Sequence, residues 1–448
     1  MPLLATDETL ARDSWYAATA VRGPGHAPLD GSTSCDVAIV GGGLAGLSAA
    51  LELAQRGRDV VLLEARQVGH GASGRNGGQA IHGLACEQDV IERQLGRADA
   101  RRVWDMSIEA LDLIRERIAR HGIDCDWRDG WLGLADGPRK GRELAAAADR
   151  IEADYGYPLQ RIAPGKVGRW IASPRFHSGV FDARSGHLHP LKYTLGLARA
   201  AVAAGARLHE HTPVQALVTA AAPGGHTRLR TAFGEVRARQ VLLAGNVYLH
   251  AAMAGLPAKL GDRIMPVGTY IACSETLDPA LACSLVPSGA AVCDTNFVLD
   301  YFRPTVDRRL LYGGRVSYST VTPAALAESM LRRMVHTFPQ LDGTKVEFAW
   351  GGFVDISMNR APDFGRLPGA AGAGGTSSDV YYLQGFSGHG LALTGLAGRL
   401  VAEAMTGDAS RFDIFARLRH RSFPGGRLLR TPALVLGMAW YRLRDLLG

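Results

Sequence analysis

Residues 35–46 read Cys-Asp-Val-Ala-Ile-Val-Gly-Gly-Gly-Leu-Ala-Gly, and this stretch decides the fold. Its apolar run Val37 to Val40 predicts a short buried strand, and a helix is predicted directly after it over 44–55. Three glycines at this junction, Gly41, Gly43 and Gly46, have the spacing G-x-G-x-x-G. Such glycines make a tight turn, let backbone approach a pyrophosphate, and allow the helix to pack on the strand.

The sequence around this junction fits a dinucleotide site. In the first turn of the helix, the N–H groups of Leu44 and Ala45 would point at phosphates. Residues 58–63 predict a second strand, and Glu64 follows it about 20 residues after Gly41, where an acid binds ribose hydroxyls. Gly69, Gly71 and Gly74 repeat the glycine spacing but follow no strand, so the spacing alone is weak evidence. A glycine-rich turn in an ordinary parallel sheet is the alternative.

Composition describes a globular chain. Its 448 residues suggest two domains, and 47% hydrophobic with 21% charged residues is ordinary. The net charge of +7 is spread along the chain without a basic stripe interleaved with aromatics, which argues against nucleic-acid binding. No apolar stretch reaches the roughly 20 residues that cross a bilayer.

The cysteines indicate a reducing compartment, so a cytoplasmic protein is expected. They form no C-x-x-C pair and no metal-ligand spacing, and neither a disulfide framework nor a metal is predicted. The acidic start of the chain (Asp7, Glu8, Asp13) is unlike a secretory signal peptide. The six cysteines are Cys35, Cys86, Cys125, Cys273, Cys283 and Cys293.

Alternating strands and helices predict an α/β fold, with a Rossmann-like domain interrupted by a second, α+β domain. Residues 1–34 would be an N-terminal arm that packs on the domain surface, and 35–90, 175–250 and 349–425 would form the dinucleotide domain. Residues 91–174 and 251–348 would form the substrate domain. Helices are expected over 99–120, 143–155, 191–204 and 323–338, the last capped by Thr322, while 176–189 is expected to be loop with short strands. Residues 426–448 are predicted to form a C-terminal helix that docks on the core or makes weak contact with a membrane surface.

A second glycine-rich junction lies near the other end of the chain. Residues 380–383 predict a strand, and the sequence Gly385-Phe386-Ser387-Gly388-His389-Gly390 opens a helix over 391–405. Two helix N-termini suit a flavin dinucleotide better than a nicotinamide one, because the second can face the ring edge that becomes negative on reduction. The motif at 71–79, Gly-Ala-Ser-Gly-Arg-Asn-Gly-Gly-Gln, also argues against an NAD-dependent dehydrogenase.

Over nearly its whole length, the chain resembles the D-amino-acid-oxidase-like flavoproteins, and among them the gamma-glutamylputrescine oxidases. The two glycine-rich junctions and the motif at 71–79 carry the family resemblance, while softer segments at 14–20, 187–193, 266–271, 301–304 and 359–367 carry the subgroup. The resemblance implies tightly bound, noncovalent FAD. His70, Cys86 and Cys293 are available for covalent attachment, but none stands in a matching motif.

The resemblance also implies which residues contact the FAD. Its ADP half would lie against the first junction, its ring along 73–79, and its pyrimidine end against the second junction. Arg75 as a surface charge and His389 as a core histidine are the alternatives. The implied cofactor residues are Gly41, Gly43, Leu44, Ala45, Gly46, Glu64, Ala65, Arg66, Ser73, Arg75, Asn76, Gly77, Gly78, Gln79, Val214, Gly245, Ser387, Gly388, His389 and Gly390.

The implied reaction is oxidation of the carbon beside a neutral amine, followed by hydrolysis of the imine to aldehyde and amine. Oxygen would take the electrons and form hydrogen peroxide. Candidates for the carboxylate of a gamma-glutamyl amine are Arg303, Arg315 and Arg360, with structural ion pairs as the alternative. Tyr270, Tyr301 and His389 are candidates for pocket walls, or simply core residues.

Three functions stay open on the sequence. The first is an FAD-dependent amine oxidase for gamma-glutamylputrescine or a related polyamine derivative. The second is an oxidase or dehydrogenase of D-amino acids or glycine derivatives that passes electrons to a quinone. The third is a flavin-binding subunit without turnover. No lysine, Lys259 included, matches the oxygen-activating lysine of some relatives, and the oligomeric state stays open.

Overall fold

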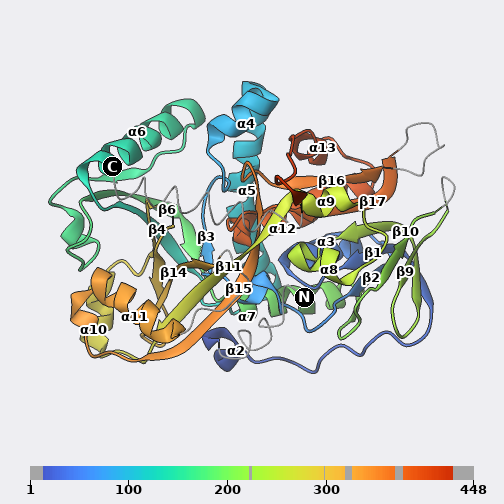
Figure 1. Ribbon diagram of the computed structural model, residues 1–448, viewed down its shortest axis with the longest axis horizontal. Coiled ribbons are helices and arrows are strands. Elements are labelled where there is room, and N and C mark those ends of the chain that lie inside the picture. Colours follow the sequence, from blue (N-terminus) through green and yellow to red (C-terminus); the bar gives the residue numbers. More distant parts are fainter. Residues whose placement is uncertain (1–13, 221–224, 297, 318–324, 369–376, 427–448) are drawn as a thin grey trace.

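The computed structural model describes residues 14–220, 225–296, 298–317, 325–368 and 377–426. This part of the chain forms two β-sheets surrounded by helices (Figure 1). The segment predicted as a C-terminal helix lies outside the described residues from 427 onward, and so does Thr322. The structure also leaves the side chain of Arg315 undescribed.

The first sheet has the parallel core that residues 35–64 predict. Its strands β17, β10, β1, β2 and β7 run parallel, β16 joins antiparallel at one edge, and β8 and β9 extend β10. The mixed sheet confirms the predicted α/β fold class. The strands are β16 Asp363–Pro368, β17 Ser377–Gln384, β10 Glu235–Leu243, β1 Thr33–Val40, β2 Val60–Leu63, β7 Arg207–His209, β8 Ala216–Val218 and β9 Thr227–Arg230.

The second sheet is largely antiparallel and lies to the left of the first sheet in Figure 1. Its two long strands, β11 and β15, pair with each other along nearly their whole length. In order across the sheet, the strands are β15 Val346–Ser357, β11 Ile264–Ser274, β14 Leu310–Ser317, β13 Tyr301–Pro304, β12 Ala291–Asp294, β4 Arg128–Ala135, β6 Ser178–His187 and β3 Gln79–Ala80, with β5 Gln160–Ile162 beside β6.

Helices cover both sheets, and among them α3, α7 and α12 pack together on one face of the first sheet. None of the described helices combines the length and apolar composition that a bilayer span requires. The helices are α2 Trp15–Thr19, α3 Leu44–Gln55, α4 Gln88–Leu95, α5 Arg97–His121, α6 Pro138–Tyr155, α7 Pro190–Ala203, α8 Leu249–Ala252, α9 Ala258–Asp262, α10 Pro279–Leu285, α11 Leu326–Thr337, α12 Gly390–Met405 and α13 Phe412–Ala416. Short 3-10 turns are η1 Ala72–Gly74, η2 Val167–Arg169, η3 Asn246–Tyr248 and η4 Pro339–Leu341.

Some local expectations are wrong. The segment 176–189 is not mainly loop, because β6 is a ten-residue strand between β4 and β3. Helix α11 begins at Leu326 after Ala325, so Thr322 does not cap it. Trp15 and Tyr16 of α2 are buried in a core cluster with residues of the second sheet, so this part of the N-terminal arm packs against the rest of the molecule.

Sheet membership bears on the division into domains. Strands β6 and β15 belong to the second sheet, although the sequence placed 175–250 and 349–425 with the dinucleotide unit. We therefore propose that the substrate unit includes 178–187 and 346–357 together with most of 91–174 and 251–348.

Candidate active site

A cavity of about 970 Å³ opens between the two sheets. Its walls come from the first turn of α3, the 70–79 segment, the end of β10, one face of β11 and β15, and the turn before α12. This volume is at the upper end of the range for small-molecule sites, which suits a large cofactor together with a substrate. The cavity therefore joins the two glycine-rich junctions that the sequence singled out.

The first junction is shaped by the lack of side chains on its glycines. Gly41 has a φ of 114°, and a Cβ there would lie 2.6 Å from the Ala244 carbonyl oxygen. A Cβ on Gly46 would lie 2.0 Å from the Gly41 carbonyl oxygen, so only glycine lets α3 pack this closely on the turn. The N-terminus of α3 consequently opens directly into the cavity, as an anion site requires.

Glu64 follows β2 and lines the same end of the cavity. Its carboxylate accepts hydrogen bonds from the backbone N–H groups of Gly42 at 2.6 Å and Arg66 at 2.9 Å. Burial raises the pKa of Glu64, although both N–H groups act in the opposite direction. The acid thus lies beside the glycine turn, where the predicted ribose contact needs it.

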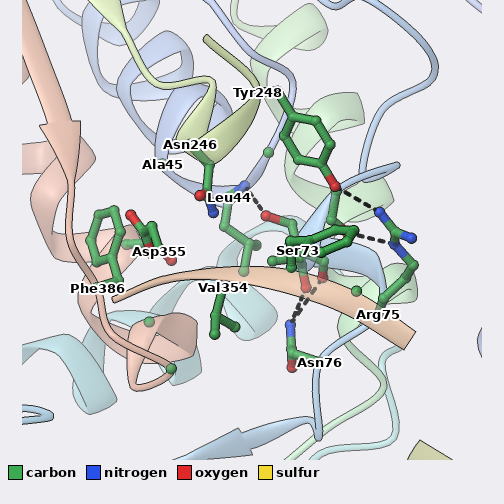
Figure 2. Close-up of a pocket in the computed structure, with 18 of the residues that line it drawn as sticks. Leu44, Ala45, Ser73, Arg75, Asn76, Asn246, Tyr248, Val354, Asp355 and Phe386 are labelled. Carbon is green, nitrogen blue, oxygen red and sulfur yellow. Dashed lines mark hydrogen bonds between the residues drawn. The ribbon is translucent and has the colours of Figure 1, made fainter. Parts of the chain in front are cut away.

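The 72–79 segment forms a tight loop against α3. The Ser73 hydroxyl accepts a hydrogen bond from the Leu44 N–H at 2.9 Å, which ties the loop to the first turn of α3 (Figure 2). The Asn76 amide donates to the carbonyls of Ala72 and Ser73 and accepts from the Gly78 N–H at 2.8 Å. These bonds fix the loop that the resemblance assigns to the flavin ring.

Arg75 is buried, with 5% of its surface exposed, so it is not a surface charge. Its guanidinium donates to the Tyr248 hydroxyl at 2.9 Å (Figure 2). It also donates to the Gly351 carbonyl at 3.2 Å. The Trp350 indole in turn donates to the Arg75 carbonyl at 3.0 Å. Arg75 therefore fastens the predicted flavin loop to β15 of the second sheet.

The second junction is held by backbone and histidine contacts. Ser387 has a φ of 53°, and its hydroxyl accepts from the Ser357 N–H at 3.1 Å. Nε2 of His389 lies 3.2 Å from the carbonyl oxygen of Ile81 and 3.1 Å from that of His82. Burial lowers the pKa of His389 to about 4, so the imidazole is neutral and its Nε2–H donates to these carbonyls.

Asp355 is a cavity residue that the sequence reasoning missed. It lies near the end of β15, it is 2% exposed, and its carboxylate accepts a hydrogen bond from the Gly385 N–H at the second junction. Figure 2 shows it beside Phe386, away from the Arg75 side of the cavity. Asp355 lies in an apolar strand, 30 residues before the turn that it contacts. Nothing in the neighbouring sequence therefore indicates that it belongs to the site.

The candidate substrate residues separate into two groups. Tyr301 and Arg360 line the cavity, and Arg360 is exposed to solvent. Tyr270 and Arg303 are buried but do not line it. Arg303 instead lies behind the flavin loop, donating to the Gly77 carbonyl at 2.9 Å and to the Tyr16 hydroxyl at 3.1 Å.

The residues present fit a dinucleotide cofactor. Of the twenty residues predicted to bind it, all but Gly46 and Gly78 line the cavity, and those two lie directly behind it. A Cβ on Gly43 would lie 2.8 Å from the Ser73 hydroxyl oxygen, and one on Gly77 would lie 2.6 Å from the Tyr301 ring. Side chains at these positions would fill the cradle. The individual roles of these residues stay predictions.

The possible attachment residues differ in position. His70 and Cys293 line the cavity, whereas Cys86 does not. Burial raises the pKa of the Cys293 thiol to about 12, so it is protonated and a poor nucleophile. This protonation state agrees with the noncovalent binding that the resemblance implies.

The sequence matches the model of one family, described as FAD dependent oxidoreductase (DAO), over residues 36–404. Gamma-glutamylputrescine oxidoreductase of Escherichia coli K12 is 42% identical to the chain over 438 residues, which cover 97% of this chain and 98% of that protein. The probable oxidoreductase OrdL of Haemophilus influenzae is 39% identical over 419 residues, covering 93% and 94%.

Solved structures with the same fold include the glycine oxidase of Geobacillus kaustophilus. It superimposes with a TM-score of 0.70 at 22% identity, covering 87% of this chain and all of the other. The L-proline dehydrogenase of P. horikoshii superimposes with a TM-score of 0.66 at 21% identity, covering 84% and 94%. These likenesses confirm the predicted architecture.

Proposed function

Because this chain belongs to the DAO family of FAD-dependent oxidoreductases, we propose that it oxidises the C–N bond of gamma-glutamylputrescine or a related polyamine derivative. The product imine hydrolyses to an aldehyde and an amine, and oxygen takes the electrons to give hydrogen peroxide. The observation that carries the proposal is the 42% identity to gamma-glutamylputrescine oxidoreductase over almost the full length of both chains. Noncovalent binding of FAD and action in the cytoplasm belong to the same proposal.

Bound FAD supplies the two-electron redox chemistry, and the residues of the chain bind and orient the cofactor and the substrate and shield them from water. The N–H groups at the start of α3 would hold the pyrophosphate, and Glu64 would bind the ribose next to them. The loop that Arg75 fastens to β15 would support the ring, and the turn at 385–388 would hold its pyrimidine end. The neutral His389 holds that turn to the carbonyls of Ile81 and His82 through its Nε2–H.

The second sheet supplies a mostly apolar wall for the substrate. Burial against such a wall disfavours the charged form of an amine, which is the form that cannot be oxidised. Of the three candidate arginines, Arg360 is the one whose described side chain lines the cavity, and it would bind the carboxylate at the far end of a gamma-glutamyl amine. The wall residues are Val267, Thr269, Cys293, Val298, Leu299, Tyr301, Val316 and Phe353.

An amino-acid oxidoreductase is the second candidate. Glycine oxidases are 23% and 25% identical to this chain over most of its length, and one of them shares the fold. A small amino acid would leave much of the wall uncovered, whereas a polyamine conjugate would extend along it. Electrons would then pass to a quinone or to oxygen.

Anaerobic reduction of the purified holoenzyme tests the proposal. The visible flavin spectrum is recorded while gamma-glutamylputrescine, putrescine, D-amino acids and glycine derivatives are added separately without oxygen. Bleaching by gamma-glutamylputrescine at low concentration, but not by amino acids, is expected.

Each other outcome has its own meaning. Bleaching only by amino acids would favour the second candidate, and a flavin that no amine bleaches would contradict both. Admitting air and measuring peroxide against reduction of a soluble quinone then separates oxidase from dehydrogenase.

A further inference from the structure

Asp355 is the one carboxylate that the described cavity wall carries near the second junction; the other acidic residue of that wall, Glu64, belongs to the first. Its side chain is fully enclosed, and it accepts a hydrogen bond from the Gly385 N–H. Its backbone carbonyl accepts from the Ser387 N–H at 3.1 Å. Asp355 therefore joins the end of β15 to the turn at 385–387 through both its side chain and its backbone.

The turn offers its N–H groups to two possible negative charges. In the ionised state, Asp355 uses the positive potential of these groups and places its own charge among them. A cofactor ring that becomes negative at the same turn would meet this charge in a poorly hydrated site, where like charges disfavour each other strongly. Protonation of Asp355 would remove the repulsion and leave the N–H groups to the ring.

We infer that Asp355 is a positioning residue that takes up a proton from solvent when the bound cofactor is reduced and releases it on reoxidation. Two electrons and one proton from the amine convert the cofactor to its anionic reduced form, and the Asp355 carboxylate gains one further proton to become the carboxylic acid. The inference rests on the proposed placement of the ring beside the turn at 385–388.

The local chemistry allows such a proton to be gained and lost near neutral pH. Burial raises the pKa of Asp355 to about 7, although the N–H groups of Gly385, Phe386, Ser387 and its own residue lower it. The described ionisable side chains on the segments next to Asp355 do not form an ion pair with it. Arg263, before β11, pairs with Asp363 at 3.4 Å, His389 is neutral, and Arg360 is exposed.

The test is the pH dependence of the midpoint potential of the holoenzyme between pH 6 and pH 9, measured by dithionite reduction with reference dyes and without any amine. Each proton that accompanies two electrons contributes about 30 mV per pH unit. The wild-type slope should steepen from about 30 to about 60 mV per pH unit as the pH rises above neutrality. A slope near 30 mV per pH unit throughout would overturn the inference.

Asp355→Asn keeps an oxygen that can accept from Gly385 but cannot titrate. The steep segment should disappear, and above pH 8 reduction should become at least tenfold more favourable, which is about 30 mV. Asp363→Asn is the matched control, because Asp363 is equally buried and bonds Tyr382 and Gln384 but lies outside the cavity wall. It should keep the steep segment. A steep segment that survives in Asp355→Asn would overturn the inference.

A second measurement uses only the wild-type protein, in case Asp355→Asn fails to fold. Electrochemical reduction in weakly buffered solution at pH 8, with the counter-electrode in a separate compartment, should remove two protons from the solvent per FAD, and infrared difference spectra should gain a buried carboxylic acid band. One proton and no such band would overturn the inference. Because dithionite or an electrode replaces the amine, a wrong substrate proposal would show as failed bleaching and leave these tests intact.

Discussion

Individual residues explain why the cofactor end of the site is predictable and the substrate end is less so. Gly41 and Gly46 act through local backbone geometry, so their spacing between a buried strand and a helix predicts the turn. Arg303 and Arg360 are both arginines near predicted turns or strands, yet one is buried behind the flavin loop and the other lines the cavity. Only the tertiary arrangement separates them, because nothing in the local sequence states which face of the sheet each side chain takes.

Arg360→Gln tests the proposed carboxylate contact. The variant should raise KM for gamma-glutamylputrescine about 10- to 100-fold, because a charge-assisted hydrogen bond contributes roughly 1.5–3 kcal/mol. Its kcat, and its KM for putrescine, which has no carboxylate, should stay within about twofold. Steady-state kinetics with both substrates checks this.

Arg169→Gln is the control for Arg360→Gln. Arg169 is also exposed but lies outside the cavity wall, so this variant should resemble the wild type with both substrates. Equal losses on gamma-glutamylputrescine and putrescine in Arg360→Gln would contradict the carboxylate role.

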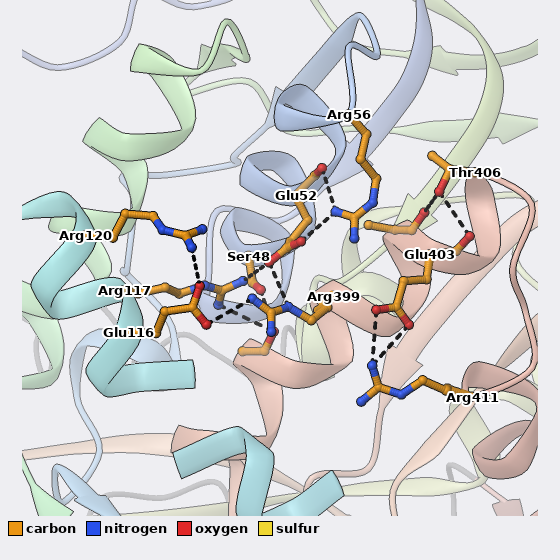
Figure 3. Close-up of polar contacts among 12 residues, drawn as sticks. Ser48, Glu52, Arg56, Glu116, Arg117, Arg120, Arg399, Glu403, Thr406 and Arg411 are labelled. Atoms are coloured by element: carbon orange, nitrogen blue, oxygen red, sulfur yellow. Dashed lines mark hydrogen bonds and ion pairs between the residues drawn. The ribbon is translucent and has the colours of Figure 1, made fainter. Parts of the chain in front are cut away.

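At the scale of elements, the contact of α3 with α12 holds the two glycine-rich junctions in place. The Ser48 hydroxyl donates to the Gly395 carbonyl at 2.5 Å, and a Cβ on Gly398 would lie 2.5 Å from Ser48. Next to this crossing, Glu52 pairs with Arg56 at 2.5 Å, and with Arg117 and Arg399 at 3.0 Å each (Figure 3). One buried carboxylate thus ties α3 to α5 and α12.

Glu52→Gln should destabilise the fold. Burial raises the pKa of Glu52, but Arg56, Arg117 and Arg399 outweigh it and lower the pKa to about 2. A depressed carboxyl pKa stabilises the folded state at pH values above the unfolded pKa, and this contribution is lost as the pH falls from about 4.5 to about 2. It amounts to about 3 kcal/mol at neutral pH.

Urea unfolding at fixed FAD concentration measures this loss at pH 7. The difference between Glu52→Gln and wild type should shrink below pH 4. Glu143→Gln is the control, because Glu143 forms an exposed pair with Arg139 at 2.9 Å on α6, and such a pair contributes less than about 1 kcal/mol. Equal effects of the two variants would contradict the importance of the buried network.

The elements themselves were predicted unevenly, for physical reasons. The bounds of α3 agree with the prediction because a glycine turn and a continuous apolar run define it locally. Strand β15 was not predicted, since Gly351 and Gly352 interrupt its pattern and its pairing with β11 supplies the missing stability. Strand β6 has polar and glycine residues but is held by neighbours on both sides.

For the whole molecule, the sequence predicts a dinucleotide domain and a substrate domain, and the structure has two sheets with a cavity between them. The unit boundaries could not be predicted as well, because the pairing of β6 with β4 and of β15 with β11 joins residues that lie from about 43 to 93 positions apart in the chain. Long-range pairing of this kind depends on the completed fold and leaves little trace in local composition.

Removal of FAD should lower the melting temperature of the whole protein. A ligand bound between both sheets stabilises them together, by about 2.7 kcal/mol at a concentration 100 times its Kd. Scanning calorimetry of the apoprotein, before and after adding FAD, checks this. FMN is the control, since it lacks the half of FAD proposed to contact Gly41 and Glu64, and it should raise the melting temperature of the apoprotein less than FAD does. An equal rise with both ligands would contradict the proposal that Gly41 and Glu64 bind the ADP half of FAD.

The cavity takes its first wall from residues near 41 and its last from residues near 390. A ribosome that has translated the first half of the message therefore presents a nascent chain that cannot yet enclose a flavin, even though its first βαβ unit is complete. Arrested nascent chains of increasing length should begin to bind FAD in a single late step, once the start of α12 has left the exit tunnel.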